Sequence, residues 1–393
     1  MLNFQFCSPT EFLFGRDTES QTGECVRKHG GTRVLVHYGG GSVERSGLLG
    51  RVLSSLDAVS IPYFTLGGAV PNPRSGLVYE GIELCRRESI DFVLCVGGGS
   101  AIDSGKAIAL GIHYDGDFWD FFSGKTGAPA HPILPVGVVL TLPAAGSEGS
   151  TASVITHEDG MFKRGYNIEQ FRPRFAVLNP ELTYTLPSYQ TACGVSDMMC
   201  HIFERYFTNT PDVDLTDRLA EALLQAIIYA APTAIREPNN YEARAQLMWA
   251  GMLAHNNLVG VDREQDWASH SIEHELSALY DVAHGAGLSV VYPAWMRYQL
   301  DHDPMRFAQI ATRVWGCDMD YQHPERTANE GIERLTAFWS SLGLPVTFAE
   351  LEAKPEDIPA LAAKTALGPD GLLGSFRPLD VKAIEAILRL ACR

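Results

Sequence analysis

The hydrophobic pattern of the chain changes near its midpoint. In the first half, short apolar runs alternate with glycine-rich turns and amphipathic stretches, the pattern of βαβ units in a parallel sheet. In the second half, strand-like alternation is absent and apolar residues recur at helical spacing, as at Leu215, Leu219, Leu223 and Ile227. We therefore predict an α/β domain of residues 1–188, with helices flanking a parallel sheet, and an all-helical domain of residues 189–393.

The expected strands of the α/β domain end in small or turn-forming residues. They lie within residues 33–42, 61–74, 91–103, 133–148 and 175–187. No Gly/Ser/Pro-rich tract separates the two halves, so we expect no long flexible linker between them. An aromatic cluster at residues 117–122 is open to two interpretations, a buried core or the wall of an apolar pocket.

Composition and charge narrow the classes of partner. The 393 residues include 31 basic and 47 acidic side chains, a formal charge of -16, with no dense Lys/Arg run. This argues against nucleic acid or an anionic membrane and favours a small-molecule partner. The eight cysteines are scattered without a C-x-x-C pair, and neither a signal peptide nor a run of about 20 apolar residues is present. We expect a soluble protein of the reducing cytoplasm.

One glycine-rich turn has the features of a phosphate site. In "FVLCVGGGSAIDSGKA" (92–107), an apolar strand is followed by Gly97, Gly98 and Gly99 and then by a helix that Ser100 is expected to cap. Glycines let a phosphate approach the backbone, and a helix N-terminus offers free N–H groups. The alternative is a βα turn without a ligand, in which Ser100 and Asp103 only cap the helix.

A second glycine run, "YGGGS" (38–42), follows the strand at which many dinucleotide folds carry an acid for the adenosine ribose. No acid stands at positions 39–41, so Gly39, Gly40 and Ser42 leave room and donors for a 2′-phosphate. This favours NADP over NAD, although Glu44 is close in sequence and a simple tight turn is the alternative. Neither run is a G-x-G-x-x-G fingerprint or a Walker A loop.

Several histidines are spaced as metal ligands. On helices, residues four apart share a face, so Asp197 pairs with His201, and His270 pairs with His274; His284 follows ten residues later. A catalytic metal site uses three or four protein ligands, so one of the five has another role. An isolated helical histidine is more often structural than a ligand. Five other histidines are given no role: His113, His131, His255, His302 and His323.

Taken together, these motifs resemble those of the iron-containing (group III) alcohol dehydrogenases, in the branch of the NADP-dependent butanol dehydrogenases and aldehyde reductases. The resemblance extends over essentially the whole chain. Its motifs are "PNPR" (71–74), "GGGSAID" (97–103), "TLPAAGSE" (141–148), Lys163 followed by "FAVLNPELTYTLP", "SDMMCHIFERY" (196–206), and the His-x-x-x-His pair followed by His-Gly. Asn179 and Ala145 depart from the residues usual in the family.

The resemblance implies a role for each candidate in the metal site. Asp197, His201, His270 and His284 match the metal ligands, and the metal is expected to be Fe2+, with Zn2+ as the alternative. His274 matches a histidine near the nicotinamide and the substrate, so it is the candidate for a proton relay.

The resemblance also implies an NADP(H) site. Its residues are Gly39, Gly40, Ser42, Gly97, Gly98, Gly99, Ser100, Asp103, Thr141, Leu142 and Lys163. Of these, Asp103 matches an acid at the mouth of the active site and Lys163 a lysine close to the cofactor, so both are also expected in catalysis with His274.

The implied fold is dehydroquinate synthase-like, with a cleft between the two domains, and the implied activity is hydride transfer between NADP(H) and a small primary alcohol or aldehyde such as butanol or butanal. A homodimer is also implied. Trp267 is the candidate for a wall of the substrate pocket.

Three other functions stay open at this stage. An NAD-dependent polyol dehydrogenase of the glycerol type would share the architecture. A lyase related to dehydroquinate synthase would need a Lys/Arg-rich pocket, and the helical half shows no such cluster. A non-catalytic metal-buffering protein would explain the histidines but not the two glycine turns.

Overall fold

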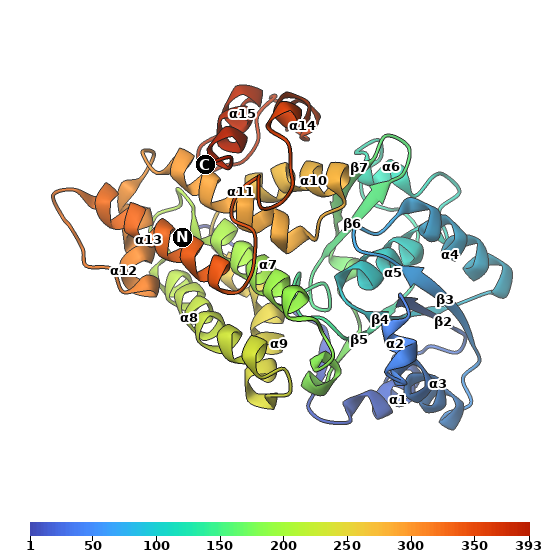
Figure 1. Cartoon of the computed structure of the whole chain (residues 1–393). Coiled ribbons are helices and arrows are strands. Elements are labelled where there is room, and N and C mark those ends of the chain that lie inside the picture. Colours follow the sequence, from blue (N-terminus) through green and yellow to red (C-terminus); the bar gives the residue numbers. More distant parts are fainter. The chain divides into compact units, whose positions relative to one another are not determined.

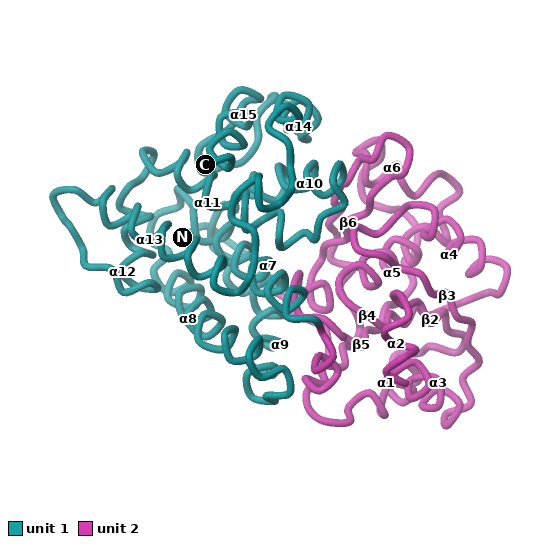
Figure 2. Tube along the Cα trace, in the orientation of Figure 1, with its two compact units in different colours: residues 1–6, 187–393 teal, residues 7–186 magenta.

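The computed structural model describes all residues, 1–393, and divides into two compact units (Figures 1 and 2). One unit is the contiguous segment 7–186, and the other joins residues 1–6 to residues 187–393. The division after residue 186 falls two residues before the expected domain limit at 188.

The first six residues lie with the helical unit, although the sequence placed them in the α/β domain. Two backbone contacts hold them there. The ammonium group of Met1 donates to the carbonyl oxygen of Pro211 at 2.8 Å, and the N–H of Leu2 donates to that of Asp262 at 2.7 Å.

The α/β unit is built on a six-stranded sheet with all strands parallel, in the order β1-β8-β5-β4-β2-β3 (Figure 1). This confirms the predicted fold class. The central strand, β4, has no exposed residue, as expected for a parallel sheet covered on both faces. The strands are β1 (Glu11–Phe14), β2 (Val34–Gly39), β3 (Tyr63–Ala69), β4 (Phe92–Gly97), β5 (Val136–Leu140) and β8 (Phe175–Leu178).

Helices and an antiparallel hairpin complete this unit. They are η1 (Thr18–Gln21), α1 (Thr22–Lys28), α2 (Ser42–Arg45), α3 (Leu48–Ala58), α4 (Ser75–Glu88), α5 (Gly99–Gly111), α6 (Trp119–Phe122), η2 (Glu169–Phe171), η3 (Pro180–Thr183) and the hairpin β6 (Ala152–His157) with β7 (Phe162–Asn167). Helix α5 packs against both β4 and β6. It approaches the sheet closely, because a Cβ at Gly105 would lie 2.2 Å from Cys95 Sγ. The aromatic residues Phe118, Phe121 and Phe122 are buried among other rings, so this cluster is core.

The second unit is all-helical from residue 187 onward, as predicted. Its helices are α7 (Ser188–Tyr206), α8 (Asp214–Arg236), α9 (Tyr241–His255), η4 (Leu258–Gly260), α10 (Ala268–Tyr280), α11 (His284–Gln299), α12 (Pro304–Trp315), α13 (Pro324–Ser341), η5 (Pro355–Asp357), α14 (Ile358–Lys364) and α15 (Val381–Leu390). Helix α7 packs against α8, α9 and α11, and every residue from 191 to 206 is buried. No helix combines the length and the unbroken apolar character needed to cross a bilayer.

The apolar residues at helical spacing predicted the helix α8 correctly, but they do not all lie on its buried face. Leu215 and Leu219 are 68% and 40% exposed, whereas Ala220, Leu224 and Ile227 are buried. In the first turns of α8 the buried face consists of small and polar residues. The positions of the large leucines therefore did not indicate which face is buried.

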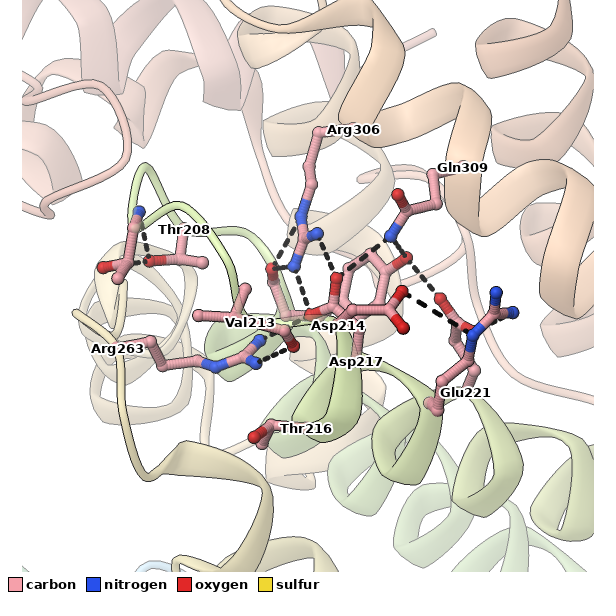
Figure 3. Close-up of polar contacts among 12 residues, drawn as sticks. Thr208, Val213, Asp214, Thr216, Asp217, Glu221, Arg263, Arg306 and Gln309 are labelled. Atoms are coloured by element: carbon pink, nitrogen blue, oxygen red, sulfur yellow. Dashed lines mark hydrogen bonds and ion pairs between the residues drawn. The ribbon is translucent and has the colours of Figure 1, made fainter. Parts of the chain in front are cut away.

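Charged residues fill the first turns of α8 instead (Figure 3). Asp217 accepts hydrogen bonds from Arg263 Nη1 and Arg306 Nη2, both at 2.7 Å, and the side chain of Arg263 is fully buried. One turn later, Glu221 accepts from the hydroxyl group of Tyr206 at 2.8 Å. This network ties α8 to α12 and to the loop that leads into α10.

Candidate metal and cofactor sites

Three helices bring the expected metal ligands together. Asp197 and His201 lie one turn apart on α7, His270 lies on α10, and His284 is the first residue of α11. Asp197 Oδ1 is 3.1 Å from His201 Nδ1, 3.7 Å from His270 Nε2 and 3.9 Å from His284 Nε2. The four side chains therefore converge on one carboxylate oxygen.

The chemistry of these atoms fits a cation. Asp197 Oδ1 and His270 Nε2 are buried without a hydrogen bond of acceptable geometry, which is costly unless another ligand satisfies them. Burial would raise the pKa of Asp197, but the neighbouring histidines, first His201, hold it well below its ordinary value. The carboxylate is thus ionised. Burial and the nearby His270 lower the pKa of His201, so this imidazole is neutral and able to bind a metal.

His274 lies one turn after His270 on α10, at the edge of this cluster. Its ring centre is 5.6 Å from that of His284 and 6.5 Å from that of His270. The ligating atoms of Glu273, His274 and His284 also lie within 4.8 Å of one another, as do those of Asp197, His201 and His270. His284 faces both groups, since its Nδ1 contacts Glu273 while its Nε2 points toward Asp197.

Two buried carboxylates beside the histidines were missed by the sequence reasoning. Glu204 Oε2 lies 2.6 Å from His270 Nδ1, and Glu273 Oε2 contacts His284 Nδ1. A signal was present, because both glutamates lie three residues after a predicted ligand on a helix, Glu204 after His201 and Glu273 after His270.

His255 was given no role, yet it adjoins the cluster. Its ring is edge-on to that of His201, with 4.1 Å between ring centres, and its Nδ1 accepts a hydrogen bond from Arg205 Nη2 at 2.9 Å. Trp267 lies 5.8 Å from His201 and 5.6 Å from His270, again between ring centres. Nothing in the spacing of His255 marked it, because it reaches the site from a separate helix, α9.

In the α/β unit, the turn at Gly97, Gly98 and Gly99 has the geometry expected of an anion site. It differs from the prediction only in the residue that caps α5. Gly97 ends β4, Gly98 is the N-cap of α5 and Gly99 is the first residue of that helix. Ser100 lies inside the helix and caps nothing, so that expectation was wrong. The first N–H groups of α5 therefore remain open to a ligand.

The other cofactor candidates lie at the same carboxyl edge of the sheet. The N–H of Thr141 donates to the Gly97 carbonyl oxygen at 3.0 Å, and a Cβ at Gly98 would lie 3.1 Å from Leu142 Cβ. A Cβ at Gly97 would lie 3.7 Å from the amide nitrogen of Gly39, so the two glycine turns are adjacent. This edge is where open α/β sheets bind their ligands.

Around the second turn, Gly40 faces open space, with no atom within 4 Å of a Cβ placed there. Ser42 begins the short helix α2. Glu44, the nearest acid, accepts a hydrogen bond from the Tyr38 hydroxyl group at 3.0 Å.

Asp103 and Lys163 lie in the interior of the α/β unit. The two oxygens of Asp103 accept from Ser147 Oγ at 2.7 Å and from the N–H of Val154 at 2.9 Å, so Asp103 braces the loop before β6. Lys163, on β7, donates to Asn72 Oδ1 at 3.0 Å.

Lys106 was not singled out from the sequence. Its Nζ is fully buried and donates to the carbonyl oxygens of Ser147, Ser150 and Ala152 at 2.7, 3.1 and 2.8 Å. It therefore holds the loop that Asp103 also braces.

Glycine turns at the carboxyl edge of a parallel sheet, together with a buried Asp/His cluster among helices, are the parts of a metal-dependent dehydrogenase. Residues 9–180 match the family "Iron-containing alcohol dehydrogenase", and residues 191–392 match "Fe-containing alcohol dehydrogenase family, C-terminal". The chain belongs to the iron-containing alcohol dehydrogenase family and is an NAD(P)-dependent oxidoreductase.

Individual relatives match over nearly the full length. The chain is 42% identical over 392 residues to the probable NADH-dependent butanol dehydrogenase 2 of Bacillus subtilis, covering 99% of each chain. It is 36% identical over 365 residues to the NADPH-dependent aldehyde reductase YqhD of Escherichia coli, covering 93% of each. The crystal structure of NADH-dependent butanol dehydrogenase A from Thermotoga maritima superposes with a TM-score of 0.96 at 36% identity, covering 100% of this chain and 99% of that one. The relatives differ in the cofactor that their names give.

Proposed function

We propose that this chain interconverts small aldehydes and primary alcohols, with butanal and butanol as representative substrates, and that it uses NADP(H). Asp197, His201, His270 and His284 hold one divalent metal ion, Fe2+ with Zn2+ as the alternative. The observation that supports this assignment best is the convergence of three imidazoles on Asp197 Oδ1, which lies buried without a hydrogen bond.

The ligand set matches the chemistry. One carboxylate and several imidazoles suit Fe2+, Zn2+, Co2+ or Mn2+, and ligand type does not choose among them. When bound, the metal polarises the substrate carbonyl, and reduced nicotinamide supplies the hydride. The protein holds its four side chains in place from three packed helices.

His274 moves the proton in this proposal. It is not among the four ligands, it is only partly buried, and its ring lies next to that of His284. Histidine is a common proton-transfer group near neutral pH, which suits proton transfer to the substrate oxygen.

The cofactor is held at the carboxyl edge of the sheet. The turn of Gly97, Gly98, Gly99 and Ser100 receives the pyrophosphate on the open N–H groups of α5. Thr141 and Leu142 line the dinucleotide pocket beside it. In this proposal Asp103 and Lys163 keep their expected places near the cofactor, Asp103 through the loop that it braces.

NADP(H) is favoured over NAD(H) by the second turn. Gly39, Gly40 and Ser42 leave space without a negative charge, and the nearest acid, Glu44, is engaged by the Tyr38 hydroxyl group. A 2′-phosphate would meet no carboxylate at Gly39 or Gly40.

A charge placed in this turn tests the preference. Gly40→Asp fits the open space, and its carboxylate would repel a 2′-phosphate and accept from a ribose hydroxyl. We expect the ratio of kcat/KM for NADPH to that for NADH to fall at least about tenfold, which is about 1.4 kcal/mol. Gly50→Asp, which adds the same charge at another open glycine on α3, is the control. A fall of equal size in both variants would refute the role of the turn.

The central experiment pairs metal analysis of the purified protein with a substrate panel. The enzyme is assayed with butanal, with dihydroxyacetone and with the substrate of dehydroquinate synthase. Butanal and dihydroxyacetone are each tested with NADH and with NADPH. We expect one metal ion per chain and fastest turnover with butanal and NADPH. Preference for dihydroxyacetone with NADH would indicate a polyol dehydrogenase, and metal binding without turnover of any substrate would refute the proposal.

A further inference from the structure

Two of the proposed metal ligands, His270 and His284, each contact a buried glutamate that is not itself among the proposed ligands. Glu204, on α7, is 1% exposed. Its Oε2 lies 2.6 Å from His270 Nδ1, and its Oε1 accepts from Ser269 Oγ at 2.6 Å and from the N–H of His270 at 3.2 Å. The Oε2 contact is within hydrogen-bonding distance but does not have the geometry of a hydrogen bond.

Glu273 repeats this arrangement on α10. It is fully buried, its Oε2 contacts His284 Nδ1, and its Oε1 accepts a hydrogen bond from Ser277 Oγ. In both cases a serine holds one oxygen of the carboxylate and the other oxygen faces the Nδ1 atom of a histidine. The same Ser–Glu–His arrangement thus occurs twice in one site.

The third histidine is oriented in a different way. His201 Nδ1 lies 2.9 Å from the carbonyl oxygen of Asp197. For His270 and His284, Nδ1 lies next to a glutamate oxygen and Nε2 is the nitrogen nearer Asp197 Oδ1, whereas His201 has its Nδ1 3.1 Å from that oxygen. Outer partners of this kind fix the tautomer and the orientation of a ligating histidine and make its free nitrogen a better donor.

The "HGAG" sequence leaves the space that this arrangement needs. A Cβ at Gly287 would lie 2.4 Å from Glu273 Oε1 and 2.7 Å from its Cγ, so only glycine lets Glu273 reach His284 in this way. A Cβ at Gly285 would lie 2.0 Å from the carbonyl oxygen of Cys193, so the first glycine lets α11 approach α7.

We propose that Glu204 and Glu273 are positioning residues that hold His270 and His284 with Nε2 directed at the metal. The inference deepens the proposed function and rests on its metal site.

The test measures metal binding directly. The enzyme and its Glu204→Gln and Glu273→Gln variants are stripped of metal and titrated with Co2+, and the visible d–d absorption and competition with a coloured chelator are recorded. We expect the apparent Kd for Co2+ to rise about tenfold to a hundredfold in each variant. The d–d spectrum should also change, because a reoriented imidazole alters the ligand field, which a purely structural role would not do.

Glu275→Gln is the matched control. Glu275 lies on the same helix as Glu273 and is equally buried, but its carboxylate faces Lys364, with 3.6 Å between Oε2 and Nζ. This variant should bind Co2+ with the affinity and spectrum of the unaltered enzyme. NADPH fluorescence checks that the α/β unit is intact in every variant.

The possible results distinguish a failure of the proposed metal site from a failure of the positioning role of Glu204 and Glu273. If the unaltered enzyme binds no Co2+, the proposed function fails. If it binds Co2+ and both Gln variants match it in affinity and spectrum, the positioning role of the glutamates is overturned and the metal site stands. Should the Gln variants not fold, Ser269→Ala and Ser277→Ala each release one oxygen of a glutamate, and an unchanged Co2+ spectrum in both would overturn the inference equally.

Discussion

Alanine at His270 is expected to abolish both metal retention and turnover, whereas alanine at His274 is expected to leave the metal bound and reduce kcat about 10²- to 10⁴-fold. The difference follows from position. His270 is buried, and its Nε2 lies without a hydrogen bond 3.7 Å from Asp197 Oδ1. His274 is one turn further along α10, partly exposed, and 6.5 Å from His270 between ring centres.

Metal content per chain and steady-state kinetics measure the two effects separately. His302→Ala is the control, since His302 hydrogen bonds Asn209 at the surface of the same unit and should change neither quantity. The division of roles is wrong if both His270→Ala and His274→Ala lose the metal to the same extent.

Alanine at Asp217 is expected to lower the free energy of unfolding of the helical unit by about 3–5 kcal/mol, because it removes the carboxylate that Arg306 and the buried Arg263 share and leaves Arg263 with Asp262 alone. Asp214→Ala, on the same helix but 73% exposed, should change it by less than about 1 kcal/mol. Five of the six tryptophans lie in the helical unit, so tryptophan fluorescence in a urea titration reports mainly on that unit. Equal effects of the two substitutions would show that the network in Figure 3 does not stabilise the fold.

The same network predicts a pH dependence. Burial would raise the pKa of Asp217, but hydrogen bonds and charge from Arg306 and Arg263 outweigh it and hold this pKa below its ordinary value. The stabilisation is therefore fully present above the pKa of the unfolded chain, near 4, and is lost as the pH falls through the lower folded value. Between pH 5 and pH 3 the unaltered protein should lose more stability than Asp217→Ala does.

The sequence predicted the elements that have a strong local signal. The five expected strands of the parallel sheet are all present, because each is a short, mostly apolar stretch bounded by turn-forming residues. Strand β1 (Glu11–Phe14) and the hairpin of β6 and β7 were not predicted. Strand β1 is four residues long at the edge of the sheet, and β7 alternates around charged residues such as Lys163 and Arg164, so neither has a strong hydrophobic pattern.

For the site, the motifs identified candidate residues but not their partners. Helical spacing placed Asp197 with His201, yet only the packing of α7 against α10 and α11 brings His270 and His284 to the same oxygen. Glu204 escaped notice because a glutamate on a helix is usually exposed, and its burial depends on the contact with α10. Ser100 failed as a cap because the glycine before it is already in the first turn of α5.

The short segment of residues 1–6 has a consequence for biosynthesis. It is synthesised before its contacts at Pro211 and Asp262, which follow more than 200 residues later, a delay on the order of 10–40 s at ordinary translation rates. The contiguous segment 7–186 has all its own contacts by then and is free to fold in the interval.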